Sequence, residues 1–190
     1  MSVVPMPWKN GGGQTRELLT WPLQSDGNWT VRVSVANIDQ DGPFSAFPGV
    51  QRWFAVLEGE GVKLDFDGKL HIERAQAMPY EFDGGDTPYC SLIEGSTLDL
   101  NLMSKQGQAS MIRMQRDLPF STTSVWRAMY CVSAGTWRDS AGRSRALPTH
   151  TLLWSGDVDA GIHWFFDATD QTVPVHGFWL SYQTLSKDSV

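Results

Sequence analysis

The sequence lacks the features that mark secreted and membrane-spanning proteins. It has only two cysteines in 190 residues, and no apolar run is long enough to cross a bilayer. The first residues show neither the basic region nor the apolar core of a secretion signal. We therefore expect a cytoplasmic protein with no membrane partner, in which Cys90 and Cys131 are buried, reduced thiols; a disulfide between them is the alternative.

Positive charge is also scarce. Fifteen lysines and arginines face 21 acidic residues, which gives a net charge of −6. This balance opposes general binding to nucleic acids or anionic membranes. The only local basic cluster, at Arg138, Arg143 and Arg145, has Asp139 beside it and is predicted to be a solvated loop. Nucleic acid is therefore not expected as a partner.

Aromatic residues and turn signals are plentiful. The chain has nine tryptophans and nine phenylalanines, and turn residues recur every ~8–12 positions, which predicts an all-β protein. Residues 30–38 alternate as a half-buried strand does, and residues 53–57 form an apolar run typical of a strand buried on both faces. Asp67-Gly68 predicts a hairpin turn. One short helix is expected within 118–123 or near Ser155.

No segment resembles a linker between domains. Residues 1–190 are therefore expected to form one compact unit. Each half has enough strands for a small barrel, so we expect a first barrel at 1–108 and a second, degenerate barrel at 109–190 that shares strands with the first.

Three consecutive glycines, Gly11 to Gly13, stand between polar and charged residues near the N-terminus. Glycine permits backbone conformations and close approaches that a Cβ would prevent. One interpretation is an anion-binding corner of exposed N–H groups and cations. The other is a tight turn between two strands. The flanking residues that would contact an anion are Lys9, Asn10, Thr15, Arg16 and Glu17.

The run at residues 41–62, with its Leu-Glu-Gly-Glu-Gly turn, resembles the first conserved stretch of a cupin. In metal-binding cupins this stretch carries a His-x-His pair and a glutamate seven residues before the first turn glycine. Here that glutamate position holds Arg52, and the histidine positions fall on Ser45 and Phe47, or on Ala46 and Pro48. A second cupin stretch near 78–84 has no histidine either. The pattern predicts no metal site, since a guanidinium repels cations and holds carboxylates.

The position of Arg52 allows a second interpretation, in which it lies on the surface and pairs with Glu58 or Glu60. Asp99 and Asn101 carry the same ambiguity. They project from one face of a strand whose other face is leucine. On a solvent-facing side they need no partner, whereas in a barrel interior they need one. The candidate partners are Arg52, Arg32, Lys9 and Arg16.

Taken together, these motifs resemble the HutD/Ves family, strongly over residues 5–105 and thinly after them. The match is carried by residues 7–17, 32–36, 41–52, 57–62 and 82–103. The resemblance implies a cupin-type (RmlC-like) double-stranded β-helix, arranged as a bicupin and often dimeric, without metal or other cofactor. It also implies a role in modulating bacterial histidine utilisation, with a small carboxylate ligand such as formylglutamate or urocanate. A second branch of the family is linked to stress and cold, and the sequence does not distinguish the two.

The favoured hypothesis is a small-carboxylate sensor that acts, as a homodimer, on another protein of histidine utilisation. The residues predicted to bind the ligand are Lys9, Asn10, Thr15, Arg16, Glu17, Ser45, Phe47, Arg52, Asp99 and Asn101.

Two other classes of function stay open. One is a metal-free isomerase or hydrolase with Glu17 or Asp99 as general base, although no catalytic arrangement is identifiable. The other is an interaction scaffold whose tryptophans build a dimer face.

Overall fold

The computed structural model describes residues 4–23, 27–156 and 161–184. These residues form strands, turns and loops, with no α-helix among them, so the expectation of an all-β protein is confirmed. The short helix expected within 118–123 or near Ser155 is wrong for the described residues. Phe120 forms an isolated bridge to Trp164, and Ser155 ends a strand. No described segment is a helix that could span a membrane. The chain divides into two units, Met1–Gln106 and Gly107–Val190.

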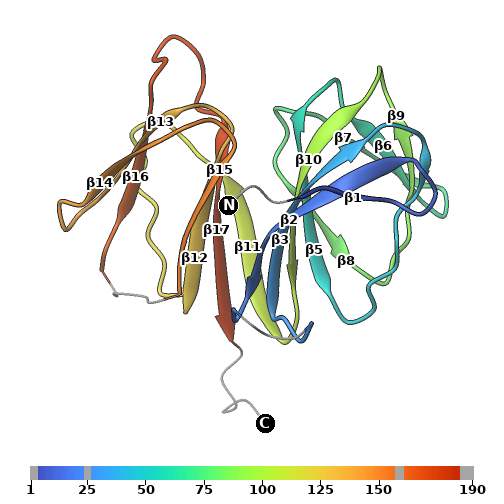
Figure 1. The fold of residues 1–190 in the computed structure, drawn as a ribbon, viewed down its shortest axis with the longest axis horizontal. Coiled ribbons are helices and arrows are strands. Elements are labelled where there is room, and N and C mark those ends of the chain that lie inside the picture. Colours follow the sequence, from blue (N-terminus) through green and yellow to red (C-terminus); the bar gives the residue numbers. More distant parts are fainter. Residues whose placement is uncertain (1–3, 24–26, 157–160, 185–190) are drawn as a thin grey trace. The chain divides into compact units, whose positions relative to one another are not determined.

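Unit 1 contains a six-stranded antiparallel sheet, ordered β1-β2-β3-β10-β5-β8 (Figure 1). Its strands are β1 (Met6–Pro7), β2 (Gly13–Trp21), β3 (Val31–Ile38), β5 (Gln51–Glu58), β8 (Tyr80–Asp83) and β10 (Thr97–Ser104). A second sheet of unit 1, ordered β4-β9-β6-β7, is formed by β4 (Gly42–Pro43), β6 (Val62–Phe66), β7 (Lys69–Glu73) and β9 (Tyr89–Leu92). Neither sheet closes into a barrel.

The apolar core of unit 1 comes from the strands that the sequence pattern indicates. The alternating segment 30–38 becomes β3, and the continuous run 53–57 lies within β5, buried on both faces. Ile38, Phe54 and Val56 pack with residues of β6, β8 and β9 in one cluster. Asp67 and Gly68 have φ angles of 52° and 93°, and they join β6 to β7 as the hairpin signal predicts.

The glycine run forms the turn between β1 and β2. Gly11 has a φ of 72°, and its N–H donates to the carbonyl of Trp8. The N–H of Gly12 donates to Oδ1 of Asn10 at 3.1 Å. These amides are therefore used within the turn, which favours the tight-turn interpretation of the run.

Gly13 permits a close approach that fixes this turn. A Cβ at this position would lie 2.2 Å from the carbonyl oxygen of Asn37 and 3.2 Å from the Trp8 ring. We expect Gly13→Ala to lower the free energy of unfolding by ~1–3 kcal/mol, because the backbone must move to relieve the clash. Urea unfolding measures this loss. Gly12→Ala is the matched control, since its Cβ would meet only the Asn10 side chain, at 3.4 Å. Equal losses in both variants would contradict the packing argument.

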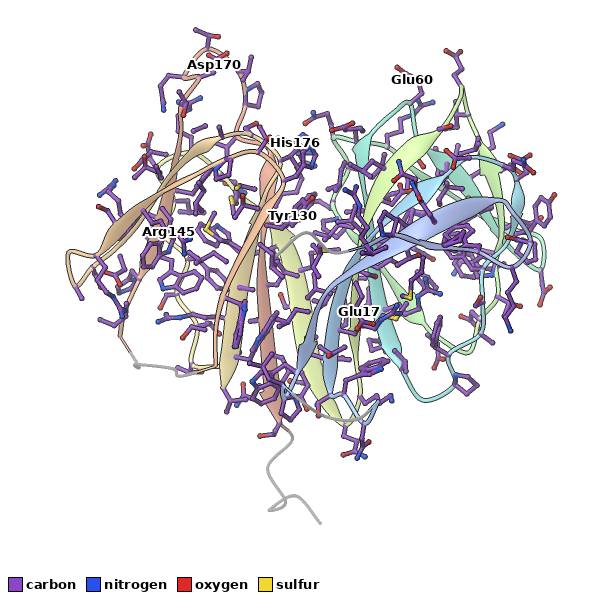
Figure 2. The ribbon with its side chains drawn as sticks, viewed as in Figure 1. Glu17, Glu60, Tyr130, Arg145, Asp170 and His176 are labelled. Atoms are coloured by element: carbon purple, nitrogen blue, oxygen red, sulfur yellow. The ribbon has the colours of Figure 1, made fainter. Side chains whose placement is uncertain are left out.

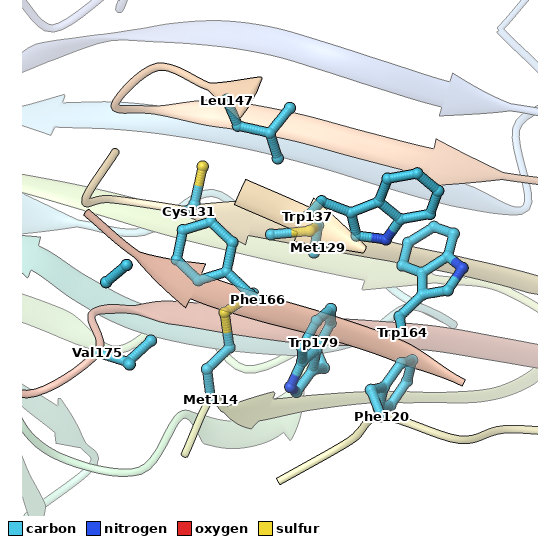
Figure 3. Packing of buried hydrophobic residues seen from close by; sticks show 11 residues of the cluster. Met114, Phe120, Met129, Cys131, Trp137, Leu147, Trp164, Phe166, Val175 and Trp179 are labelled. Atoms are coloured by element: carbon cyan, nitrogen blue, oxygen red, sulfur yellow. The ribbon is translucent and has the colours of Figure 1, made fainter. Parts of the chain in front are cut away.

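Unit 2 also holds two sheets. The first, ordered β11-β17-β12-β15, consists of β11 (Gly107–Arg113), β12 (Trp126–Cys131), β15 (Thr151–Ser155) and β17 (Gly177–Thr184). The second, ordered β14-β13-β16, consists of β13 (Gly135–Asp139), β14 (Ser144–Leu147) and β16 (Trp164–Ala168). Aromatic side chains dominate the core of this unit, as Figure 3 shows. Cys90 and Cys131 are both buried and free, as expected.

Candidate ligand-binding site

A cavity of about 680 Å³ opens in unit 1 between the β1–β2 turn, the segment 43–47 and the inner faces of β3, β5 and β10. Its apolar lining comes from Met6, Pro7, Trp8, Ala36, Ile38, Pro43, Phe44, Phe47, Phe54 and Met103. Its polar lining comes from Lys9, Asn10, Thr15, Arg32, Ser34, Ser45, Arg52 and Asn101. Three of these residues are cations, and no lining residue within the described part of the chain is acidic.

Arg52 is the most deeply placed of these cations. It is the second residue of β5 and is only 5% exposed, so the alternative of a surface arginine is wrong. Its Nη2 donates to Oδ1 of Asn101 at 3.1 Å, and its Nη1 donates to the carbonyl of Ser45 at 3.4 Å. Its Nε is buried with no hydrogen-bond partner among the described residues. Among the described residues, no carboxylate forms an ion pair with this guanidinium.

Aromatic rings surround the same guanidinium. Its Cζ lies 4.9 Å from the ring centroid of Phe82, 5.2 Å from that of Phe44 and 5.5 Å from that of Phe47. These cation–π contacts hold the planar group without neutralising its charge. The side chain is therefore fixed in place by rings and one amide, with its positive charge uncompensated by an acid.

Burial and, to a smaller extent, the positive charge of Arg32 together lower the pKa of Arg52 from 12.5 to about 10. The guanidinium still carries its proton at neutral pH. A pKa displaced by this amount corresponds to roughly 3 kcal/mol against the charged form. A bound anion would offset that cost, because an opposite charge nearby favours the charged form.

The charge of Arg32 is already balanced within the protein. Its Nε donates to Oε2 of Glu17 at 2.8 Å, and its Nη1 contacts the sulfur of Met103 at 3.7 Å. Glu17, labelled in Figure 2, lies on β2. Glu17 does not line the cavity, so it acts on the site by neutralising Arg32.

The remaining predicted residues on the β1–β2 side differ in how they lie relative to the cavity. Lys9 and Asn10 are exposed, and both line it. Thr15 lies deeper, where its hydroxyl accepts a hydrogen bond of 2.8 Å from Nε1 of Trp8. Arg16 is half-buried on β2 and does not line the cavity.

Asp99 shares a face of β10 with Asn101 but lies outside the cavity. It is fully buried, and Thr97 Oγ1 donates to its Oδ2 at 2.8 Å. Its Oδ1 has no partner in the part of the chain that the structure describes. Burial raises the pKa of Asp99 well above its usual value, the hydrogen bond from Thr97 opposes this, and Glu73 adds to it. Burial therefore favours the neutral form of this carboxyl, which has no arginine partner among the described residues.

The structure thus brings seven of the ten predicted residues together and leaves Arg16, Glu17 and Asp99 outside the cavity. The seven are Lys9, Asn10, Thr15, Ser45, Phe47, Arg52 and Asn101. The prediction omitted Arg32 and Ser34 from the site, although both alternate onto the inward face of β3. It also omitted Phe44 and Phe54, which nothing in the sequence pattern separates from ordinary core residues.

The cavity does not fit the metal that many cupins hold. Histidine, cysteine, aspartate and glutamate are absent from its described lining. Elsewhere in the described residues no three such side chains gather as possible ligands. Divalent transition metals need these donors, and the cations present would repel them.

Comparison with known proteins places the chain. The family model of HutD matches residues 1–171. The chain belongs to the HutD family. Among the relatives of this HutD-family chain, protein Ves from Citrobacter koseri is 32% identical over 133 residues, which cover 69% of each protein. A protein of Pseudomonas putida named for the hutC 3′ region is 37% identical over 98 residues, or 52% of each protein.

Solved structures agree with this assignment. A conserved protein of unknown function from Pseudomonas aeruginosa PAO1 aligns with a TM-score of 0.84 and 27% identity, covering 97% of the chain and 96% of that protein. HutD from Pseudomonas fluorescens SBW25 aligns with a TM-score of 0.81 and 25% identity over the same shares. Bacillus subtilis oxalate decarboxylase, at 8% identity and a TM-score of 0.64, shares the fold alone. The cupin-type fold expected for this HutD-family chain is confirmed.

Proposed function

We propose that the protein binds a small carboxylate in the cavity of unit 1, with the carboxylate on Arg52, and that it modulates bacterial histidine utilisation. The observation that carries this proposal is the buried guanidinium of Arg52, which has no acidic partner among the described residues. Buried charges are ordinarily paired, so an uncompensated one in a cavity favours an anionic ligand. Carboxylates suit a guanidinium because they can accept two parallel hydrogen bonds from it.

The rest of the lining supports a ligand with a second polar group. Lys9 at the mouth offers a second positive charge, whereas Arg32 is neutralised by Glu17. The walls between them are largely aromatic, and a volume of about 680 Å³ is of the size that small-molecule sites have. This arrangement fits a ligand that is several atoms long, with a carboxylate at one end for Arg52 and a second polar group that reaches Lys9 at the mouth.

The names of relatives favour histidine utilisation as the context. The Pseudomonas fluorescens neighbour is called HutD, and the Pseudomonas putida relative is named for the hutC region. Formylglutamate and urocanate are therefore the first ligands to test. In this proposal the protein works as a homodimer, and ligand binding alters its contact with another protein of the same system.

Calorimetric titration of the purified protein tests the proposal. The probes are N-formyl-L-glutamate, urocanate and, as a control, the neutral diamide of N-formylglutamate. We expect one carboxylate to bind and the diamide not to bind, because only a negative charge offsets that of Arg52. Recovery of the ligand unchanged after incubation, followed by NMR, is the result expected of a sensor. Equal binding of the acid and its diamide would overturn the assignment.

Lys9→Met should weaken this binding less than changes at Arg52 do. Lys9 is exposed at the mouth, where water and salt screen its charge. We expect a loss of about three- to fivefold in affinity that shrinks as salt is added. Titrations at low and high salt measure it, with Lys63→Met on the exposed side of β6 as the control. A loss that does not change with salt would contradict a rim position for the contact.

A further inference from the structure

Unit 2 repeats the strand plan of unit 1. Its described strands β11 to β17 correspond, in chain order, to β3 and β5 to β10. The sheet order β11-β17-β12-β15 matches β3-β10-β5-β8, and the order β14-β13-β16 matches β7-β6-β9. All these pairs are antiparallel in both units. Agreement in order, neighbours and direction across seven strands indicates two copies of one unit.

The two copies place an arginine at the same position. Arg52 is the second residue of β5, and Arg127 is the second residue of β12. Arg52 lies opposite Met103 in β10, and Arg127 lies opposite Ser181 in the corresponding strand β17. Both arginines are buried, at 5% and 1% exposure.

The two guanidinium groups also have similar surroundings. Arg127 lies 4.7 Å from the ring centroid of Trp164, as Arg52 lies 4.9 Å from that of Phe82. Nη1 of Arg127 donates to a backbone carbonyl, that of Ile162, at 2.6 Å. Nη1 of Arg52 likewise donates to a backbone carbonyl. Position and burial therefore agree between the two groups, and each contacts an aromatic ring, although the rings lie on strands that do not correspond, β8 and β16.

The residue that differs most is the partner of the arginine on the neighbouring strand. In unit 1 this is Asn101, which lies opposite Phe54 and accepts a hydrogen bond from Arg52. The corresponding residue of β17 is Trp179, which lies opposite Met129. Trp179 is 4% exposed and stacks on Phe120 with ring centroids 5.1 Å apart, inside the aromatic cluster of Figure 3.

The second cation of the cavity also has no counterpart in the described part of unit 2. Arg32 lies opposite Met103, whereas Ser110 lies opposite Ser181 in unit 2. No described strand of unit 2 corresponds to β1 and β2, which bring Lys9 and Thr15 to the cavity. A buried indole thus stands at the strand position where unit 1 has the cavity-lining amide of Asn101.

We propose that unit 2 holds a second carboxylate site, centred on Arg127, that the indole of Trp179 occupies, so that each chain binds one ligand and an aromatic carboxylate enters unit 2 only when that indole is removed. This proposal rests on the proposed function, in which Arg52 binds a carboxylate. Its own prediction depends on Arg127 and Trp179. An aromatic carboxylate suits the opened site because its ring replaces the indole and its charge meets the guanidinium.

The test is made in the Arg52→Met background, in which carboxylate binding at the site of unit 1 is strongly weakened. Binding of 4-fluorobenzoate is followed by ¹⁹F NMR in this parent, after adding Trp179→Ala, and after adding Arg127→Gln to both changes. The neutral control probe is 4-fluorobenzyl alcohol. We expect Trp179→Ala to increase benzoate affinity at least about tenfold, and Arg127→Gln to remove that gain while binding of the alcohol is unchanged.

Benzoate and alcohol affinities that respond alike to Arg127→Gln would overturn the proposal, as would a folded Trp179→Ala variant that binds neither probe. If Trp179→Ala does not fold, Trp179→Leu, which removes less of the side-chain volume, is used in its place. The unmodified chain supplies an independent measurement, because the proposal predicts a stoichiometry of one carboxylate per chain, and two would contradict it. If no carboxylate binds the unmodified chain, the proposed function fails, while the fluorobenzoate experiment still decides the question for unit 2.

Discussion

Arg52→Met is expected to reduce carboxylate affinity by about 100-fold or more, because it removes the only deeply buried cation that lines the described cavity. Methionine keeps much of the apolar volume against Phe44, Phe47 and Phe82, so the cavity walls have a side chain to pack against. Titration calorimetry measures the loss. Arg52→Lys is the informative comparison. Lysine keeps a positive charge but lacks the planar guanidinium that stacks on the rings. The carboxylate affinity of Arg52→Lys should therefore fall between that of the unmodified protein and that of Arg52→Met.

The same position should show a trade between binding and stability. A buried guanidinium whose pKa is lowered to about 10 destabilises the ligand-free protein. Removing the guanidinium in Arg52→Met should therefore stabilise the protein. This gain in stability is opposed by the loss of the hydrogen bond to Asn101, whose amide would be left buried without its partner. The double variant Arg52→Met/Asn101→Leu removes both polar groups and is expected to be more stable than the parent by ~1–3 kcal/mol. A double variant that is less stable in urea unfolding, or an Arg52→Met protein that binds normally, would contradict the role given to Arg52.

Asp99→Asn is expected to change how stability depends on pH. Burial favours the protonated form of the Asp99 carboxyl in the folded protein and raises its pKa well above that of the unfolded chain. Between those two pKa values the unfolded state binds fewer protons than the folded state. The free energy of unfolding therefore falls as pH rises through that window, by up to about 1.4 kcal/mol for each pH unit. Asparagine does not titrate, so the variant should lose this slope.

Urea unfolding between pH 4.5 and 9 measures the slope for Asp99→Asn and for Asp86→Asn, which changes an exposed aspartate. The other ionisable groups near Asp99 are Glu73 and Cys90, and His71 pairs with Glu73 at 2.9 Å. They remain in both variants, so the difference between the two isolates Asp99. Parallel pH profiles for the two variants would show that Asp99 is not held neutral.

Local patterns predicted the strands well because each depends on near neighbours. The alternation in 30–38 and the Asp67-Gly68 turn both follow from period-two burial and turn chemistry. The helix expected within 118–123 was wrong because Phe120 pairs with Trp164, a residue far away in sequence. Pairing at such distances leaves no local signal.

The site was predictable where a residue of unlike chemistry replaces a conserved residue of a known motif. Arg52 in place of a metal-binding glutamate indicated a cation in the cavity, and the structure places it there. The partner of Asp99 was not predictable, because it is Thr97 on the same strand, which donates to one carboxyl oxygen, and not a distant arginine. The balance of Arg32 by Glu17 depends on the pairing of β2 with β3 across a bulge, which no sequence period encodes.

The most direct test of the central claim observes the guanidinium of Arg52 itself. Protein labelled with ¹⁵N-arginine gives an Nε–Hε signal for each ordered arginine, and the signal missing in Arg52→Met identifies that of Arg52. On titration with N-formyl-L-glutamate or urocanate, we predict that this signal shifts in a saturable way, because its unpartnered N–H gains a carboxylate. A ligand that binds in the calorimeter while the Arg52 signal stays in place would contradict the account.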